Sequence, residues 1–237
     1  MLTLTKLDKK LIFPPTDIAL TEPNGLLAFG GDLSAERLLL AYESGIFPWF
    51  SQNEPIMWWS PDPRGILPLD NFKCSKSLKK FVRSCNYQIT INIAFNQVID
   101  ECATIPRDDS GTWITYDMIN AYKNLHRLGH AHSIEVWNED TLVGGLYGIV
   151  IGKMFCGESM FHKATNASKV AMFSLVEILK SQAAEFIDCQ MQNPHLASLG
   201  CVEMPRDKFL IILQQQSQKT FDKSVWQPQA LNLIKWL

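Results

Sequence analysis

Residues 132–161 read HSIEVWNEDTLVGGLYGIVIGKMFCGESMF, a stretch with many β-branched and aromatic residues. Residues of these types favour strands, because their branched or planar side chains fit a pleated surface. Asn138-Glu139-Asp140 interrupts the pattern with residues that are typical of a turn. We therefore predict three antiparallel strands in this part of the chain.

The segments on both sides of this meander have clear helical or strand patterns. Those before it predict a helix, a strand, an amphipathic helix and a helix that opens at Thr115: 75–85, 87–93, 94–103 and 115–129. After it, Ser168 is the expected N-cap of a long helix, followed by a strand and two helices: 168–185, 186–190, 195–200 and 205–218. This order predicts an α+β layer arrangement, and it is similar to the acyl-CoA N-acyltransferase (GNAT-like) fold.

Residues 1–62 have a different composition, dense in proline, glycine and tryptophan. Turn signals recur along this segment, and Ser34 is the expected N-cap of one short helix that ends near Gly45. The two stretches that follow, GIFPWF and WWSPDPRG, contain too many prolines for us to predict regular structure there. We expect a small N-terminal domain over 1–62 and a larger domain over 63–237.

Composition and length exclude several classes of protein. The chain has 237 residues, 46% of them hydrophobic and 19% charged, as in globular proteins. No apolar run approaches the roughly 18 residues that span a membrane, and no secretion signal is recognisable. The six cysteines form no CxxC pair, and His130 and His132 have no third ligand at a suitable spacing. We expect a protein of the reducing cytoplasm without a metal.

Four basic residues repeat at helical spacing: Lys76, Lys79, Lys80 and Arg83. Residues three and four apart share one face of a helix, and no acid occurs between Asp70 and Asp100 to neutralise them. A solvated surface helix explains this pattern as well as a contact with nucleic-acid phosphates does. The net charge of −2 does not exclude such a local basic surface.

Four tryptophans lie in or beside expected loops: Trp49, Trp58, Trp59 and Trp113. Aromatic rings near a basic surface can stack on an unpaired nucleobase. Packing in the core remains the alternative for each ring.

Hydrogen-bonding side chains gather where the strand 186–190 ends: Asp188, Gln190, Asn193, His195 and Ser198. Asp188 and Gln190 are two apart on a strand, so we expect their side chains on one face. An acid and an amide so placed can align a nucleophile and help remove its proton. The alternative is that these residues only cap a turn and a helix.

Several long sequence motifs of this chain together resemble those of the bacterial leucyl/phenylalanyl-tRNA–protein transferases. They are EPNGLLAFGGDLS, YESGIFPWFS, IMWWSPDPRG, TWI, HSIEVW, LVGGLYGIVIGKMFCGESMF, NASK, DCQMQNPHLASLG and EMPR, and they extend from about residue 22 to residue 206. The resemblance implies a small N-terminal domain joined to a domain of the acyl-CoA N-acyltransferase type. It also implies an aminoacyltransferase that transfers leucine or phenylalanine from charged tRNA to proteins beginning with arginine or lysine. Proteins marked in this way enter the bacterial N-degron pathway.

The resemblance also implies roles for individual residues. Asp188 and Gln190 match a catalytic relay, Trp49 and Trp113 match residues that hold the terminal adenosine, and Glu158 matches a substrate-binding acid. Asn193 joins the substrate-binding set, and an apolar pocket for the transferred side chain is implied from Leu146, Phe155, Met172, Leu175, Ser181 and Ile187. Lys76, Lys79, Lys80 and Arg83 are the expected tRNA contacts.

Three further expectations concern the donor, the partners and the alternative functions. Residues 161–171, FHKATNASKVA, lack the glycine-rich turn that would cradle a pyrophosphate, so coenzyme A is not the expected donor. No cofactor is expected; leucyl-tRNA, phenylalanyl-tRNA and proteins with N-terminal arginine or lysine are the expected partners of a monomer. An acyl-CoA N-acyltransferase and a non-catalytic RNA-binding adaptor are the competing functions.

Overall fold

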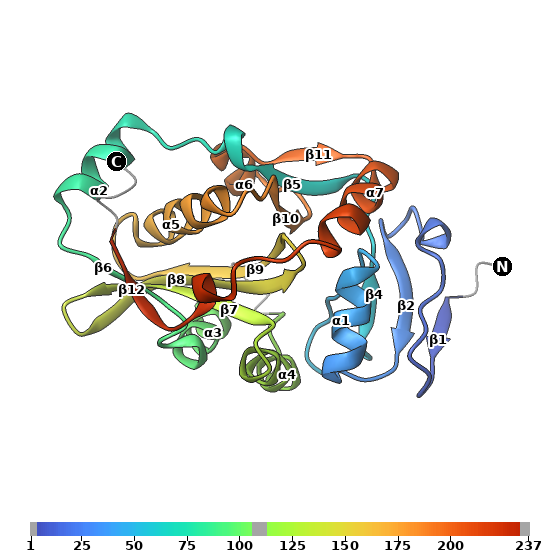
Figure 1. Ribbon diagram of the computed structural model, residues 1–237. Helices are drawn as coiled ribbons and strands as arrows, with labels where there is room; N and C mark the ends of the chain where they lie inside the picture. Colours follow the sequence, from blue (N-terminus) through green and yellow to red (C-terminus); the bar gives the residue numbers. More distant parts are fainter. Residues whose placement is uncertain (1–3, 106–112, 233–237) are drawn as a thin grey trace.

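The computed structural model describes residues 4–105 and 113–232, which form two β-sheets and the helices packed on them (Figure 1). The first sheet has the strand order β1-β2-β4-β3, and the second has the order β11-β5-β10-β9-β8-β7-β6-β12. The predicted α+β class, with a small N-terminal unit before a larger sheet, is confirmed.

The N-terminal segment contains more regular structure than its prolines suggested. Its strands are β1 (Thr5–Leu7), β2 (Leu26–Gly30), β3 (Phe47–Pro48) and β4 (Met57–Trp59). Helix α1 (Ala35–Glu43) begins as predicted after Ser34, whose side chain accepts a hydrogen bond from the Arg37 amide. The prediction of irregular structure for GIFPWF and WWSPDPRG was wrong. Phe47 and Pro48 form β3, and β4 pairs with both β2 and β3 while Pro61 and Pro63 lie outside its three residues.

The predicted meander forms the middle of the second sheet. It consists of β7 (Ala131–Asn138), β8 (Thr141–Ile151) and β9 (Met154–His162), which are antiparallel to one another in turn. Strand β6 (Gln88–Ile91) pairs with β7, and β12 (Gln229–Leu231) pairs with β6. On the other side β10 (Phe186–Gln190) runs parallel to β9, and β5 (Arg64–Pro68) and β11 (Val202–Met204) follow.

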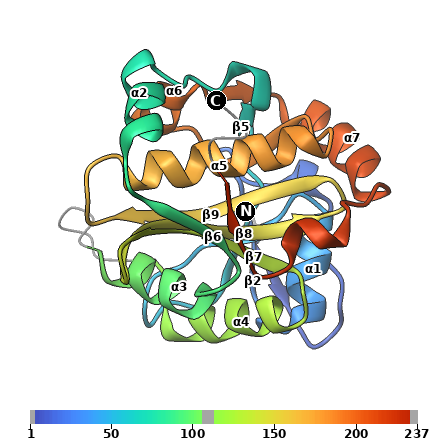
Figure 2. The same ribbon diagram turned by 60° about the vertical axis from the view of Figure 1, so that its left-hand side comes forward.

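Helices cover both faces of this sheet (Figure 2). Helix α5 (Ala167–Ser181) lies on one face with α2 (Lys76–Ser84) beside it, and α3 (Phe95–Thr104) and α4 (Tyr116–Arg127) cover the other. Helices α6 (Pro194–Leu199) and α7 (Arg206–Ser217) follow β10 and β11. Three short 3₁₀ turns complete the described chain: Thr16–Ile18, Leu69–Asn71 and Lys223–Trp226. No helix of the described ranges is long and apolar enough to cross a membrane.

The long helix α5 differs from its predicted bounds at both ends. Its N-cap is Asn166, which adopts a left-handed backbone with φ 62°, and Ser168 is already the second helical residue. Asparagine tolerates this conformation better than most residues do, which explains why the helix begins earlier. The helix ends at Ser181, before Ala183, which has φ 55° and ends the regular backbone.

A buried carboxylate, Glu135, joins β7 to the start of α3. The N-cap of α3 is Ala94, which has no side chain to cap the helix. Glu135 instead accepts hydrogen bonds from the Ile93 amide (3.4 Å), the Thr90 hydroxyl (2.5 Å) and the Ser133 hydroxyl. Burial raises the pKa of Glu135 against the opposing effect of these donors. This carboxylate therefore holds the chain just before α3.

The N-terminal sheet shares a hydrophobic core with one face of the larger sheet. Leu38 and Trp58 belong to the same buried cluster as Met118, Tyr147 and Phe161. A second cluster fills the space between α5 and the other face. The last residue of β4 and the first of β5 lie on either side of residue 62, and the division into domains at that point remains a prediction.

Candidate active site

A cavity of about 440 Å³ opens between β9, β10, α5 and the loop before β4. Its lining combines apolar, aromatic and polar side chains from segments far apart in the sequence. The residues that bear on its chemistry are Trp49, Trp113, Leu146, Phe155, Glu158, Met160, Met172, Leu175, Ile187, Gln190, Asn193 and His195. Nearly all the residues that we expected to bind the substrates therefore meet in one place.

Two neighbouring β-bulges present the polar groups of this cavity. In β9 the pairing shifts so that Glu158 lies opposite no residue of β8, and in β10 the pairing shifts between Asp188 and Gln190. Gln190 adopts a left-handed backbone with φ 63°. Bulges redirect a side chain and are common beside active sites. The prediction that Asp188 and Gln190 share one face of a regular strand was wrong for this reason.

Asp188 lies behind the cavity, in a buried ion pair with Arg64. Nε and Nη2 of Arg64 donate to the two carboxylate oxygens of Asp188 at 2.8 and 2.7 Å, and each side chain is 1% exposed. The same carboxylate accepts the backbone N–H of Gln190 at 2.9 Å. Asp188 is not part of the cavity lining, so it does not face a substrate there as we expected. It holds Gln190 in place through the backbone of that residue.

Arg64 is itself fixed from several directions. Its Nη1 donates to the carbonyl oxygen of Gly45 at 2.9 Å, and its guanidinium lies over the rings of Phe47 and Phe209. Burial is the largest single influence on the pKa of Arg64 and lowers it, but the charge and hydrogen bonds of Asp188 and smaller contributions from other neighbours outweigh it, so the pKa is raised. The arginine therefore remains charged and connects the end of α1 to strand β10.

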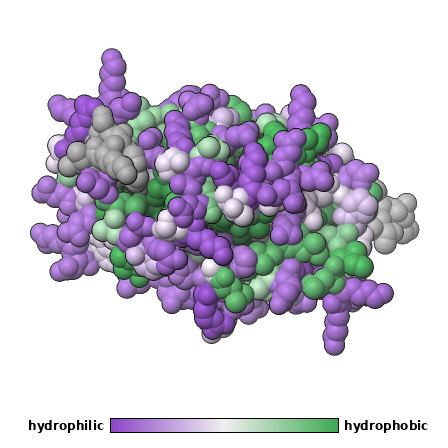
Figure 3. Space-filling model, in the orientation of Figure 1, coloured by the Kyte–Doolittle hydropathy of each residue, from purple (hydrophilic) through white to green (hydrophobic). Residues whose placement is uncertain are grey.

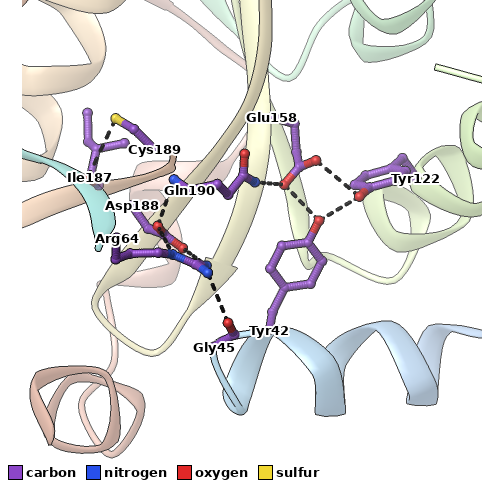
Figure 4. A network of polar contacts seen from close by, with 9 residues as sticks. All are labelled: Tyr42, Gly45, Arg64, Tyr122, Glu158, Ile187, Asp188, Cys189 and Gln190. Atoms are coloured by element: carbon purple, nitrogen blue, oxygen red, sulfur yellow. Dashed lines mark hydrogen bonds and ion pairs between the residues drawn. The ribbon is translucent and has the colours of Figure 1, made fainter. Parts of the chain in front are cut away.

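Glu158 is the carboxylate that lines the cavity, and it takes part in a network with two tyrosines and Gln190 (Figure 4). Tyr42 and Gln190 donate to its Oε1 at 2.7 and 2.8 Å, and Tyr122 donates to its Oε2 at 3.1 Å. Burial raises the pKa of Glu158 to about 7, although the hydrogen bonds oppose this. Glu158 therefore titrates near neutral pH.

The number of protons supports this raised pKa. The hydroxyls of Tyr42 and Tyr122 also contact each other, at 2.5 Å, so three oxygen–oxygen contacts link the two tyrosines and Glu158. Two hydroxyl protons can satisfy only two of these contacts. A protonated Glu158 would supply the third. Burial and the Glu158 charge both raise the pKa values of the tyrosines well above their ordinary value, so both remain neutral.

The aromatic residues divide into two groups. Trp49, which is 38% exposed, and the half-buried Trp113 both line the cavity. Trp58 and Trp59 are buried, and their indole nitrogens donate to the carbonyl oxygens of Gly30 and Trp49. Trp58 and Trp59 therefore pack in the core, which was the alternative to base stacking. Trp49 and Trp113 remain available to stack on a nucleobase.

The inner part of the cavity is apolar. Leu146, Phe155 and Ile187 project from three adjacent strands of the sheet, and Met172 and Leu175 face them from α5. Ser181 is not part of this lining. It is the exposed last residue of α5, six residues or about 9 Å beyond Leu175, and its hydroxyl donates to the carbonyl oxygen of Ile178. The structure thus removes Ser181 from the expected pocket.

The turn after β10 carries Asn193 and His195 to the edge of the cavity. Asn193 is the N-cap of α6, and its Oδ1 accepts the Leu196 amide at 2.8 Å. Ser198 donates to the carbonyl oxygen of His195 within the same helix. The capping alternative is therefore correct for Asn193, which lines the cavity as well.

The basic residues of α2 lie apart from the cavity. Helix α2 begins after Ser75, as predicted, and buries Leu78 and Val82 against the rest of the protein. Its four basic residues are exposed: Lys76, Lys79, Lys80 and Arg83. We call them the basic face of α2; this corner is hydrophilic at the upper left of Figures 1 and 3. None of the four contributes to the lining of the cavity.

Sequence reasoning missed three residues of this site: Arg64, Tyr42 and Tyr122. Arg64 is separated from Asp188 by 124 positions and Tyr42 from Glu158 by 116 positions, and no local pattern connects them. Among the residues that the structure describes, no group of three histidine, cysteine, aspartate or glutamate side chains is placed to hold a metal ion.

An apolar pocket beside a carboxylate and an amide, with two indole rings at its edge, is typical of an enzyme that binds an apolar group next to a reacting centre. Comparisons with known proteins define the class as a transferase. The model of the family described as leucyl/phenylalanyl-tRNA protein transferase matches residues 66–214, and the model of its N-terminal domain matches residues 31–62. The chain belongs to the leucyl/phenylalanyl-tRNA–protein transferase family.

Individual relatives cover almost the whole chain. A leucyl/phenylalanyl-tRNA–protein transferase of Pseudoalteromonas atlantica is 64% identical over 231 residues, which are 98% of this chain and 99% of the relative. One of Tolumonas auensis is 53% identical over 230 residues, 97% of this chain and 98% of the relative. The solved structure of L-PGS from Bacillus licheniformis has 13% identity and a TM-score of 0.38, and covers 71% of this chain and 54% of its own. This structural similarity is too low to bear on function.

Proposed function

We propose that this protein transfers leucine or phenylalanine from an aminoacyl-tRNA to the α-amino group of proteins that begin with arginine or lysine. The transferred residue marks its acceptor for degradation by the N-degron pathway. The observation that carries this proposal is the single cavity in which an apolar pocket adjoins Glu158 and Gln190. Membership of the family supports the nature of the donor.

The donor is proposed to occupy the cavity with its amino-acid side chain innermost. Leu146, Phe155 and Ile187 would contact the leucine or phenylalanine from the sheet, and Met172 and Leu175 would contact it from α5. The terminal adenine would then reach the rings of Trp49 and Trp113, because a base has a π-face that stacks on an indole. The ester carbonyl between these two parts would lie near Gln190.

Gln190 and Glu158 are proposed to receive the attacking amine. The Nε2 of Gln190 is used by Glu158, so its Oε1 is left to accept a hydrogen bond from the incoming amine. The carboxylate of Glu158 lies directly behind this amide and favours the positive charge that develops on the nitrogen. Because its pKa is about 7, Glu158 can also take up a proton and release it again near neutral pH.

The proposed reaction requires no energy source beyond the donor. The amine nitrogen attacks the ester carbonyl, the bond from that carbon to the ribose oxygen breaks, and the proton lost by the amine ends on the ribose hydroxyl. An amide replaces an ester, which is favourable. The α-amine has a pKa of about 7.7–8.0, so a fraction of it is already neutral at pH 7 and modest assistance suffices.

Asp188 has a positioning role in this scheme. Its carboxylate is occupied by Arg64 and by the Gln190 amide, which leaves it no direct contact with the acceptor. It would act by keeping Gln190 in the left-handed conformation that presents its side chain to Glu158.

The body of the tRNA is proposed to contact the basic face of α2. This face is exposed and its lysines make no ion pair with a carboxylate of the described residues. Lysine and arginine bind phosphate groups largely regardless of base sequence. We propose that the protein acts as a monomer, with each chain carrying one complete cavity.

The transfer assay tests this function directly. Radiolabelled leucyl-tRNA is incubated with the protein and a peptide that begins with arginine, and a peptide that differs only in an N-terminal glycine is the control. Label should pass to the arginine peptide and not to the glycine peptide. Binding of leucyl-tRNA without transfer to either peptide would instead indicate an RNA-binding adaptor.

A further inference from the structure

Three basic side chains lie near one another beside the cavity, and His195 lines it: His162 at the end of β9, Lys169 in the first turn of α5, and His195 in α6. We call these three residues the basic rim. His195 lines the cavity itself, and it is close enough to Lys169 and His162 for both to affect its titration. The basic rim is separate from the basic face of α2, which does not line the cavity.

The spacing along two elements places the basic rim beyond the apolar pocket. Met160 lines the cavity from β9, and His162 is two residues further along the same strand, so the two side chains share a face. Met172 and Leu175 line the cavity from α5, and Lys169 is three residues before Met172, one turn nearer the start of the helix. His162 and Lys169 therefore follow the lining residues of β9 and α5 just outside the cavity, on the side where His195 lines it.

The basic rim has no anionic partner in the part of the chain that the structure describes. Among the described residues, no carboxylate forms an ion pair with Lys169, His162 or His195. Lys163, the residue next to His162, differs in this respect, because its Nζ contacts Glu101 Oε1 at 2.5 Å. Burial, then the neighbouring Lys169 and His162, lower the pKa of His195. An anion in their midst would relieve this unfavourable arrangement.

The position of Lys169 on its helix is also unfavourable by itself. It is the third residue of α5, whose first turn contains no acid and whose N-cap makes no side-chain hydrogen bond. A cation near a helix N-terminus opposes the helix dipole, whereas an anion there is stabilised by it. A bound phosphate beside Lys169 would satisfy both the lysine and the helix terminus.

We propose that the basic rim binds a phosphodiester group at the 3′ end of the donor, between its terminal adenosine and the preceding nucleotide. This site rests on the proposed function, because it takes the adenosine to lie at Trp49 and Trp113. With the aminoacyl group in the apolar pocket, the remainder of the nucleic acid must leave by the open end. The first phosphate outside the pocket then meets Lys169 and His195.

The experiment compares two small donors that differ by that phosphate. Leucyl-adenosine has no phosphodiester, and the leucyl ester of the dinucleotide cytidylyl-adenosine has one. The variant is Lys169→Gln/His195→Gln, and the matched control is Lys163→Gln, which removes an ion-paired lysine from the adjoining loop. For each protein, kcat/KM is measured with both donors and an arginine-led peptide, and binding of unesterified cytidylyl-adenosine is measured by tryptophan fluorescence.

In the wild-type protein we expect the dinucleotide donor to be preferred. The double variant should reduce the ratio of kcat/KM for the dinucleotide to that for leucyl-adenosine about tenfold, through KM, as expected for the loss of charge-assisted hydrogen bonds. It should weaken cytidylyl-adenosine binding by a similar factor, and Lys163→Gln should change neither quantity. An unchanged ratio, or equal losses with both donors, would overturn the phosphate site. A wild-type protein inactive with both donors and with charged tRNA would overturn the proposed function and this site with it.

Discussion

Replacing Asp188 by asparagine should destabilise the protein far more than replacing a comparable aspartate on the surface. Asp188 and Arg64 are each 1% exposed and are joined by two hydrogen bonds of 2.8 and 2.7 Å. Asparagine has nearly the same shape but no charge, so Asp188→Asn leaves the guanidinium buried without a counter-ion. Breaking a buried pair in this way costs about 3–5 kcal/mol of unfolding free energy. For a chain of this size that corresponds to a melting temperature lower by about 6–20 °C.

The surface pair of Asp100 and Lys123 supplies the matched control. Lys123 Nζ lies 2.7 and 2.9 Å from the two oxygens of Asp100, distances like those at Asp188, but the Asp100 side chain is 53% exposed. Water screens such a pair, and its loss typically costs about 0–1 kcal/mol. Asp100→Asn should therefore leave stability almost unchanged.

Urea unfolding of the wild type, Asp188→Asn and Asp100→Asn measures this difference in stability. The midpoint for Asp188→Asn should fall strongly with an unchanged slope, and the midpoint for Asp100→Asn should stay near that of the wild type. Single-turnover transfer by the folded fraction should also fall in Asp188→Asn. The single oxygen of asparagine must serve both Arg64 and the Gln190 amide, and its NH2 group would face an Arg64 donor. If Asp188→Asn were no less stable than Asp100→Asn, the buried ion pair would not hold the site together. A stable but slow Asp188→Asn protein would favour direct chemistry by Asp188.

Four other predictions concern the cavity and its surroundings. Glu158, with a pKa of about 7, should make the transfer rate rise as pH passes 7, and Glu158→Gln should leave only the inflection of the acceptor amine near 8 in single-turnover profiles. Because folding raises the pKa of Glu158 from 4.5, wild-type unfolding free energy should fall relative to the variant as pH rises from about 4.5 to about 7. Leucyl-tRNA should exceed isoleucyl-tRNA in kcat/KM by about ten- to a few-hundredfold, since one methyl at Cβ discriminates by about 1–3 kcal/mol, and equal use of both would contradict the assigned pocket. Reversing two charges on the basic face of α2 should lower the slope of log affinity for tRNA against log salt by about 1.4–1.8, while equal losses with leucyl-adenosine would indicate a role in folding alone. Glu135→Ala should cost about 1–3 kcal/mol of unfolding free energy by leaving buried donors unpaired, with normal transfer per folded molecule; unaltered urea unfolding would contradict the structural role of Glu135.

Local patterns predicted the helices of the larger domain and strands β6 to β10 of its sheet, most of which are long enough to show a period, but they missed the short strands β5, β11 and β12. The three strands of the meander and the capped helix α2 followed directly from alternation and from Ser75. The strands of the N-terminal sheet have only two to five residues, too few to show one. They form because β4 can pair on both sides, with Trp58 fully buried, and pairing between distant segments leaves no mark on local composition.

The candidate site was predictable only in part for the same reason. The family resemblance identified Glu158, Gln190 and the tryptophans Trp49 and Trp113 at the cavity, because each occurs within a recognisable sequence motif. Alternation placed Asp188 at the reacting centre, and the bulge in β10 moved it to the ion pair behind. A bulge adds one residue to a strand, so every side chain after it points to the opposite face of the sheet. No feature of FIDCQ indicates where the bulge occurs.

The buried ion pair also explains how two separate parts of the chain form one cavity. Trp49 follows the N-terminal strand β3, whereas Gln190 ends a strand of the larger sheet. Arg64 donates to the carbonyl oxygen of Gly45, just after α1, and to Asp188, two residues before Gln190. Tyr42, near the end of the same helix, contacts Glu158. The N-terminal segment is thus connected to Glu158 directly and to Gln190 through Asp188. A change that loosens α1 should therefore disturb the reacting centre before it disturbs the apolar pocket, which lies between α5 and the sheet.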